Sequence, residues 1–420
     1  MKKVLALLLA VLMIVSFCAC GNSENTSDSV SDVVSDTNNE TESESEAGDN
    51  TDASTLKIGI ILVGDENEGY TWAHIDGIKK AAQELGIADN QILWKYSVLE
   101  NESCHDAAVD LVDSGCTYIF SNSYGHQSFM QQAAEEYPEV NFVAATGDTA
   151  AASGLDNFSN AFTDVYEARY VSGVVAGMKL AELMNDGKIT DPKIGYVGAY
   201  PYAEVVSGYT AFLLGIQSVV PEAYMEVVYT NSWFSIPDEA EAANTLMADG
   251  CVIIGQHADS TGAPSAVQAA YKEGKIAYSV GYNIDMLSVA PDAALTSATN
   301  CWDAYYKYAF GAALKGEKLV KDWSEGLEGN AVAITTLGAS CAAGTAEKVE
   351  EVEAAIKSGE LHVFDTSKFT VGGEHLASYD KTYGFEGNEM ISDGYFHESE
   401  LRSAPCFDIR IDGITENTNN

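Results

Sequence analysis

Short apolar runs alternate with segments of helical periodicity along most of the chain. The runs at 56–63, 118–122 and 141–145 are rich in Val, Ile, Phe and Ala, which is typical of strands buried on both faces of a parallel sheet. Apolar residues at helical spacing lie between them, for example at 72–85 and 129–137. This alternation predicts an α/β fold in which helices cover a parallel sheet.

The same alternation starts again with a long helical segment at 166–184 and a strand-like run at 193–198. A single hydrophobic core stops growing near about 250 to 300 residues, so two such series predict two lobes. The expected division is an N-terminal lobe at 56–163 and 286–338, a C-terminal lobe at 164–285, and an extension at 339–420 that packs on the lobes. Within the extension we expect a helix at 345–358 and short strands at 362–364 and 404–411.

Polar and aromatic residues follow directly where two strand-like runs of the second lobe end. His257 and Asp259 follow the first run, and Tyr282 and Asp285 end the next. In open α/β sheets, ligands bind outside the carboxyl ends of the strands, so these side chains are expected on one rim. Asp259 and Asp285 also suit helix caps, and His257 fits a packed, hydrogen-bonded residue better than a general base or metal ligand.

Large aromatic residues occupy comparable positions throughout the chain. Rings on which a flat heterocycle can stack contribute about 1 to 3 kcal/mol per base, although sugar-binding sites use such platforms as well. Trp72 and Trp302 stand at helix starts and fit the core equally well. The aromatic candidates for ligand contact, each after a predicted strand or at the start of the next helix, are Tyr70, Trp72, Tyr124, Tyr200, Trp233, Tyr282 and Trp302.

Two further polar residues have competing interpretations. Asn160 is a candidate amide for reading the edge of a base, and it also suits a residue that shapes a turn. Arg169 lies within the long helix, where we expect it to pair with a carboxylate rather than contact a solute.

Enzyme signatures are missing from the sequence. There is no G-x-S-x-G elbow, P-loop or zinc motif, and the loop at 64–69 after the first strand carries acids where a dinucleotide site needs glycines. We therefore expect no catalytic residue, no metal ligand and no cofactor.

The N-terminus has the features of an export signal. A basic start precedes an apolar run at 4–17, which is too short to span a bilayer. Residues 17–20 resemble the lipobox of bacterial lipoproteins, which implies a signal peptide at 1–19 and a lipid on Cys20; an ordinary secretory signal is the alternative. The acidic, Ser/Thr-rich stretch at 20–55 is expected to be a disordered linker.

The net charge limits the possible binding partners, and the cysteine spacing limits the possible metal sites. The formal net charge of −41 argues against nucleic acid and anionic membrane surfaces as partners. None of the cysteines after the signal forms a CxxC pair, and no His accompanies them at metal-ligand spacing. Export permits disulfides, so buried thiols and one or two bridges both remain open. These cysteines are Cys104, Cys116, Cys251, Cys301, Cys341 and Cys406.

Seven stretches together resemble the basic membrane protein (Bmp/Med) family, which comprises solute-binding lipoproteins of ABC importers. The resemblance implies a type I periplasmic-binding-protein fold, in which two Rossmann-like lobes joined by a hinge close on a ligand. It also implies a monomer on the outer side of the bacterial cell membrane that delivers a purine nucleoside, or a free purine such as adenine, to a permease. The matching stretches are 69–77, 157–162, 167–177, 194–201, 230–234, 256–260 and 281–286.

Two positions depart from the nucleoside-binding branch of that family. The branch resembles Gly-Val-Asp at 281–283, where its Asp grips ribose hydroxyls, and it carries a Lys near 302. Asn283 and Trp302 stand here instead, which favours a free base over a nucleoside. A sensory lipoprotein that presents its closed form to a membrane receptor, and a binder of another small solute such as a sugar, are the alternatives.

Overall fold

The structure is a computed structural model that describes residues 55–417. The expected signal peptide at 1–19, the lipidation site Cys20 and nearly all of the linker at 20–55 lie outside the described residues.

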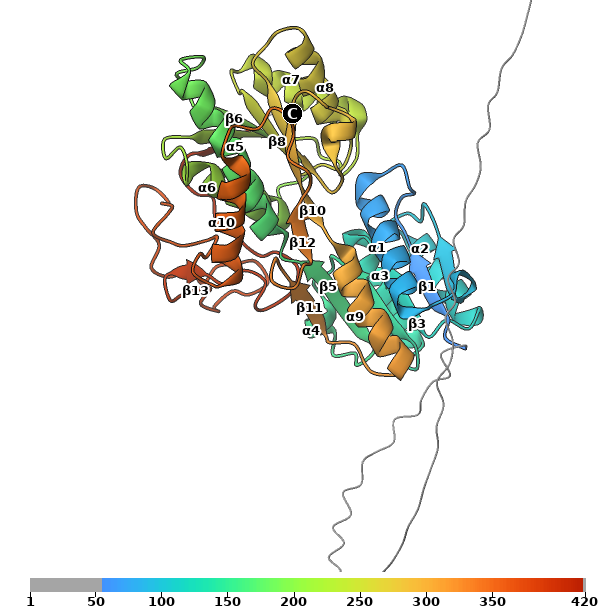
Figure 1. Cartoon of the computed structure of the whole chain (residues 1–420). Coiled ribbons are helices and arrows are strands. Elements are labelled where there is room, and N and C mark those ends of the chain that lie inside the picture. The colour runs from blue at the N-terminus through green and yellow to red at the C-terminus, as the bar shows by residue number, and fades with distance from the viewer. Residues whose placement is uncertain (1–54, 418–420) are drawn as a thin grey trace, which may run out of the picture. The chain divides into compact units, whose positions relative to one another are not determined.

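The first lobe is built on a six-stranded parallel sheet (Figure 1). All four residues of β1, like those of β3, are buried, because helices cover both faces of the sheet. The helices are α1 (Gly69–Leu85), α2 (Glu102–Asp113), α3 (Gln127–Glu136), the short α4 (Ala150–Ser153) and α9 (Trp302–Lys315). The strand order is β11 (Asp322–Glu325), β5 (Phe158–Thr163), β4 (Asn141–Ala145), β3 (Tyr118–Ser121), β1 (Ile58–Ile61) and β2 (Ile92–Lys95).

The second lobe contains a seven-stranded sheet that is parallel except for one edge strand, β12, which runs antiparallel to β10. The strand order is β12 (Val332–Ile334), β10 (Ala294–Asn300), β9 (Tyr278–Tyr282), β8 (Ile253–Gln256), β6 (Lys193–Gly198), β7 (Tyr224–Tyr229) and β15 (Ile414–Asn417). Its helices are α5 (Val165–Asn185), α6 (Ala203–Gln217), α7 (Ile236–Ala248), α8 (Gly262–Lys272) and α10 (Thr345–Lys357).

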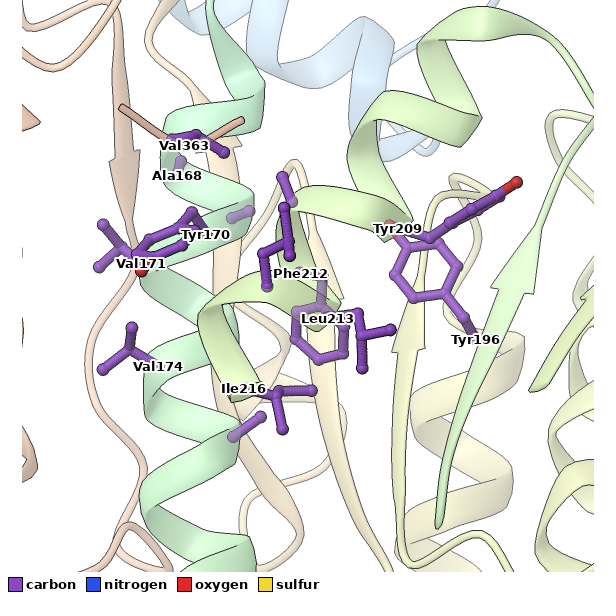
Figure 2. Close-up of a cluster of buried hydrophobic side chains, with 14 of the residues drawn as sticks. Ala168, Tyr170, Val171, Val174, Tyr196, Tyr209, Phe212, Leu213, Ile216 and Val363 are labelled. Atoms are coloured by element: carbon purple, nitrogen blue, oxygen red, sulfur yellow. The ribbon is translucent and has the colours of Figure 1, made fainter. Parts of the chain in front are cut away.

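Helices α5 and α6 form the densest part of the second core. Val171 and Val174 of α5 belong to the same buried apolar cluster as Phe212 and Ile216 of α6 (Figure 2). The backbones approach closely because glycine stands at the contact: a Cβ added at Gly173 would lie 2.2 Å from the carbonyl oxygen of Phe212. The small residues of the long helix therefore set its distance from α6.

The chain crosses between the lobes three times. It leaves the first sheet after β5 for α5, returns after β10 to α9, and leaves again between β11 and β12. Two of these crossings are joined where they pass each other, since Thr163 Oγ1 donates to Asn300 Oδ1 at 2.5 Å. Two parallel α/β lobes with crossings between them confirm the predicted type I periplasmic-binding-protein fold.

The segment at 286–338 is divided between the lobes, whereas we expected all of it in the first. Strand β10 pairs in parallel with β9, and β12 pairs with β10, so both extend the second sheet. Only α9 and β11 return to the first lobe, where α9 packs on α1 and β11 pairs with β5. The periodicity of the sequence gives the type of each element but not the sheet that it joins.

The C-terminal extension packs on the second lobe through α10, which contacts α5, and through β15, which pairs with β7 (Figure 1). The two short strands expected at 362–364 and 404–411 do not form. Their apolar residues serve an irregular core instead, in which the rings of Phe364 and Phe407 stack with their centroids 4.2 Å apart. A small hairpin of β13 (Ile391–Ser392) and β14 (Tyr395–Phe396) lies against this core.

The six cysteines of the described residues are free thiols. Four of them are buried, and burial raises the pKa of Cys104 and Cys251 to about 12. These two side chains therefore behave as small apolar core residues, in line with the thiol alternative.

Candidate ligand-binding site

A cavity of about 360 Å³ lies between the two lobes at the carboxyl ends of their strands. This is where open α/β sheets bind ligands, and the volume suits a small molecule. The first lobe contributes Val63, Gly64, Asp65, Asn67, Glu68, Tyr70, Ser97, Glu100, Asn122, Ser123, Tyr124 and Thr146 to the wall, and the second contributes Glu204, Trp233, Phe234, Asp259 and Tyr282.

Backbone geometry at the strand ends turns these side chains into the cavity. Thr146 directly follows β4 with a φ of 66°, a rare conformation for a β-branched residue that often accompanies a functional site. On the other lobe, the amide of Asp259 donates to the carbonyl of Trp233 at 2.7 Å. This hydrogen bond joins the backbones of the two residues, and the side chains of both line the cavity.

Asp259 is fixed by a chain of amide hydrogen bonds that leads to the hinge. Its Oδ1 accepts from Asn283 Nδ2 at 2.7 Å, and Asn283 Oδ1 accepts in turn from Asn300 Nδ2 at 2.8 Å. Asn300 is the residue that Thr163 joins across the two crossings. Because Asn283 is held at a φ of 61°, its amide is positioned for this role by a conformation that asparagine tolerates well.

The second oxygen of Asp259 has no hydrogen-bond partner within residues 55–417. Burial raises the pKa of Asp259 well above its ordinary value, and the nearby carboxyls of Glu68, Glu239 and Glu204 raise it further. A raised pKa favours the protonated carboxyl, which offers a donor as well as acceptors. Asp259 can therefore pair with a ligand edge that carries both an N–H and a lone pair.

The cavity wall is acidic: it carries five carboxyl groups, and none of the described residues that line it is Lys, Arg or His. Such a wall repels phosphate and carboxylate groups and favours ligands that donate hydrogen bonds. The five acids are Asp65, Glu68, Glu100, Glu204 and Asp259.

Besides Asp259, all four of the other acids have structural partners. Asp65 accepts from the amide of Asn67 at 2.9 Å. Glu68 caps α1 by accepting from the amides of Tyr70 at 2.9 Å and Thr71 at 2.8 Å. Glu100 accepts from the amide of Gly125 at 3.1 Å, and Glu204 lies 3.1 Å from His257 Nε2. Asp259 is the buried member of the five, and its second oxygen faces the cavity without a protein partner among the described residues.

Below the cavity floor, Arg169 supports Tyr282. The guanidinium carbon lies 3.7 Å from the centre of the Tyr282 ring, and Nη1 donates to the Gln256 carbonyl at 2.5 Å. We expected Arg169 to pair with a carboxylate, and this is wrong, because a ring and a carbonyl occupy its surroundings. Burial, together with the nearby Arg169, lowers the pKa of His257 to about 4, so this histidine is neutral and packed as expected.

Comparison with models of known protein families shows which family the chain belongs to. The family model described as ABC transporter substrate-binding protein PnrA-like (Bmp) matches residues 56–367. The chain belongs to this family.

Two Bmp-like relatives carry different ligand names. A purine-binding protein of Brucella abortus is 34% identical over 310 residues, which cover 74% of this chain and 83% of the relative. A putative ABC transporter glucose-binding protein of Haloferax volcanii is 30% identical over 332 residues, which cover 76% of this chain and 77% of the relative.

Solved structures agree with the fold of the Bmp family. The solute-binding protein of an ABC transporter system from Aeropyrum pernix superposes with a TM-score of 0.63 at 16% identity, covering 76% of this chain and 94% of the other. The family match makes the protein an ABC transporter substrate-binding protein, and the family is a solute-binding one.

Five of the residues proposed from the sequence of this Bmp protein meet at the cavity. Two of them come from the first lobe and three from the second, so residues of both lobes line the cavity. They are Tyr70, Tyr124, Trp233, Asp259 and Tyr282.

The other five proposed residues lie away from the cavity wall. Trp302 is 1% exposed and stacks on His74 with ring centroids 4.0 Å apart, so it belongs to the core of the first lobe. Trp72, on the outer face of α1, is 42% exposed. Tyr200 stacks on Tyr202 at 5.1 Å, next to Trp233 but one layer outside the wall.

Asn160 and Asp285 have structural roles. The Asn160 side chain is buried, accepts from the amide of Ala150 at 2.7 Å and donates to the carbonyl of Ala144 at 2.9 Å. It shapes the turn after β4, which is the second of its two expected roles. Asp285 is exposed and caps a short 3₁₀ turn by accepting from the amide of Leu287 at 2.9 Å. This is the capping role that the sequence allowed as the alternative to ligand contact.

Several residues of the cavity wall were not predicted from the sequence. Asn122 and Thr146 follow β3 and β4 directly, so the signal that found Asp259 could have found them. Glu204, at the start of α6, and Phe234, just beyond Trp233, had no comparable signal.

Within residues 55–417 there is no group of three or more His, Cys, Asp or Glu side chains arranged to hold a metal ion. No helix in the same range combines the length and apolar character needed to cross a bilayer.

Proposed function

We propose that this Bmp protein is a lipid-anchored, extracytoplasmic receptor for a purine-type ligand, with a free base such as adenine favoured over a nucleoside. The observation that carries the proposal is the unpartnered oxygen of Asp259 beside Trp233 in an acidic, aromatic cavity. The name of the Brucella abortus relative supports the same ligand class.

The wall chemistry fits a flat heterocycle. Tyr70, Tyr124 and Trp233 offer ring surface from both lobes, and stacking on such rings is worth about 1 to 3 kcal/mol per base. The protonated carboxyl of Asp259 is complementary to the alternating donors and acceptors of a purine edge. None of the described residues that form the wall is basic, which argues against nucleotides, because their phosphates need a basic side chain.

A free base is favoured because both positions that depart from the nucleoside-binding branch are already engaged. Asn283 gives its amide to Asp259 and its oxygen to Asn300. Trp302 fills space in the first core against His74 rather than offering a charge to a sugar.

A sugar is the second candidate, since the Haloferax volcanii relative is named glucose-binding and carboxyls with aromatic rings also suit sugar hydroxyls. A sensory role that hands the closed form to a membrane receptor uses the same cleft.

The proposed cycle needs no chemistry on the ligand. The solute binds between the lobes, the hinge closes, and the permease recognises the closed form. A lipid on Cys20 would hold the protein at the outer face of the cell membrane, within reach of the permease.

A calorimetric and thermal-shift screen tests the ligand class. Adenine, guanine, hypoxanthine, adenosine, inosine, AMP and glucose are titrated under the same conditions, and a bound ligand in excess raises the unfolding midpoint. We expect the tightest binding for a free base and none for AMP. Tighter binding of a nucleoside would remove the preference for a base, and binding of glucose alone would replace the purine proposal.

Mass spectrometry of membrane-extracted protein tests the anchor. We expect a lipid-modified N-terminal peptide that begins at Cys20 and disappears in the Cys20→Ser variant. An unmodified N-terminus elsewhere would indicate an ordinary secretory signal instead.

A further inference from the structure

The C-terminal extension continues beyond the part of the chain that the family model covers, which ends at residue 367. Apolar side chains of this later part, among them Phe369, Phe396 and Phe407, are buried in the core of the second lobe. The segment at 398–406 differs from the rest of the extension because it also contacts the first lobe.

One end of this segment is fixed to the second lobe. Glu398 is 5% exposed, and its Oε1 accepts from Ser207 Oγ at 2.6 Å, while its Oε2 accepts from the amide of Phe407 at 2.7 Å. Ser207 lies on α6 just after Glu204, which lines the ligand cavity. The segment is therefore attached to the helix that forms part of the cavity wall.

The amide of Cys406, at the other end, donates back to Glu398 Oε2 at 3.1 Å, and the middle of the segment reaches two acids of the first lobe. The amide of Ser403 donates to Asp322 Oδ1 at 2.7 Å, and Arg402 Nη1 lies 3.4 Å from Asp148 Oδ2. The Arg402 side chain is 9% exposed and that of Asp148 is 16% exposed, so solvent screens this ion pair less than a surface pair.

Asp148 connects the ion pair to the ligand cavity. Its Oδ2 also accepts from the hydroxyl of Tyr124 at 3.4 Å, and Tyr124 lines the cavity. The Tyr124 ring in turn faces that of Tyr202, on the second lobe, with centroids 6.3 Å apart. Arg402, Asp148 and Tyr124 thus form a path from the extension to the cavity mouth.

We propose that Arg402 is a positioning residue for the ligand cleft: through Asp148 it holds Tyr124 and the first lobe against the second, so that segment 398–406 acts as a strap that favours the closed cleft. The inference rests on the proposed ligand site. The three backbone crossings persist whether the cleft is open or closed, whereas the contact between Arg402 and Asp148 can break when the lobes separate. An interaction made in only one of two states shifts the equilibrium towards that state.

The test compares Arg402→Gln with Arg410→Gln. Arg410 is a matched control because it lies in the same extension and pairs with Glu416 at 3.2 Å, away from the cavity wall. We expect Arg402→Gln to raise both the Kd and the dissociation rate of a purine base about three- to tenfold, with an unchanged association rate. Arg410→Gln should leave all three unchanged.

A double-mutant cycle separates positioning from a general loss of structure. Asp148→Asn retains an oxygen for the Tyr124 hydroxyl but removes the charge, so it should reproduce the faster dissociation. Its effect should not add to that of Arg402→Gln, because both remove one interaction. Small-angle scattering of the ligand-free variants should show a larger radius of gyration than the wild type has.

Unchanged dissociation in Arg402→Gln, or fully additive effects in the cycle, would overturn the strap. If the wild-type protein binds no purine base, the ligand proposal fails by itself, and the scattering comparison still decides on the strap. Equal radii for the wild type and both variants would then reject it.

Discussion

The backbone amide of Asp259 donates to the carbonyl of Trp233 at 2.7 Å, and both residues line the cavity. In the proposed site, the ligand edge pairs with the free oxygen of Asp259 and the ligand ring stacks on the Trp233 indole. Buried hydrogen-bonding groups and stacking rings each carry a measurable part of the affinity, which allows the two residues to be tested separately.

Replacing Asp259 with alanine should weaken binding of a purine base by about tenfold or more, because a buried hydrogen bond to the ligand is lost. Isothermal calorimetry measures the change. Asp285→Ala is the control, since this exposed carboxylate caps a 3₁₀ turn outside the cavity. Equal effects of the two variants would remove Asp259 from the site.

Replacing Trp233 with alanine should also weaken binding at least about tenfold, the expected effect of losing one stacking partner. Calorimetry again provides the measurement, because the substitution removes a fluorophore. Trp72→Ala, on the exposed face of α1, should bind like the wild type. A Trp233 variant with unaltered affinity would show that the indole does not contact the ligand.

Residue patterns predicted part of the site for a physical reason. The carboxyl ends of the strands of a parallel sheet lie at one edge, so the sequence alone predicts that Asp259 and Tyr282 lie close together. Trp302 could not be placed, because a tryptophan at a helix start suits a ligand and a core equally. Only the stacked His74 ring decides between them.

At the scale of elements, α1 and α9 pack against each other through a glycine. A Cβ at Gly77 would lie 2.7 Å from the backbone nitrogen of Asp303, so the two helix backbones approach closely there. Gly311, on α9, has no atom within 4 Å of an added Cβ. Replacing glycine with alanine therefore creates a clash at Gly77 and fills open space at Gly311.

Gly77→Ala should lower the free energy of unfolding by about 1 to 3 kcal/mol, because the helices must move apart. Gly311→Ala should raise it by up to about 1 kcal/mol, since alanine has the higher helix propensity. Urea unfolding followed by circular dichroism measures both. Similar changes in the two variants would contradict the close packing of α1 on α9.

Element types were predictable over most of the chain, but the partners of some elements were not. Strand β10 is assigned to the second sheet only by its backbone pairing with β9. In the extension, Phe364 and Phe407 stack in an irregular core. The spacing of apolar residues in the sequence does not predict such packing.

Across the whole molecule, buried carboxyls link stability to pH. Burial raises the pKa of Glu398, Glu239 and Glu167 from 4.5 to about 7, and that of Asp164 from 3.8 to about 6. The folded state therefore binds more protons than the unfolded state between these values. The stability that the protonated groups provide is complete below the unfolded pKa and is lost as pH rises through the folded pKa.

The protein should therefore have a higher unfolding midpoint near about pH 5 than near about pH 8. The net charge of −41 acts in the same direction, because repulsion among carboxylates grows with pH. Differential scanning calorimetry across this range measures the trend, and Glu398→Gln should reduce its slope. A midpoint that rises steadily with pH would contradict the protonation of these groups.

Strand β15 occupies the outer edge of the second sheet, alongside β7. Shortening the chain by this strand would uncover a row of unsatisfied amides and carbonyls, which is a template for self-association. Strand β15 thus protects the edge of β7. A purification tag should be added after this strand and should not replace it.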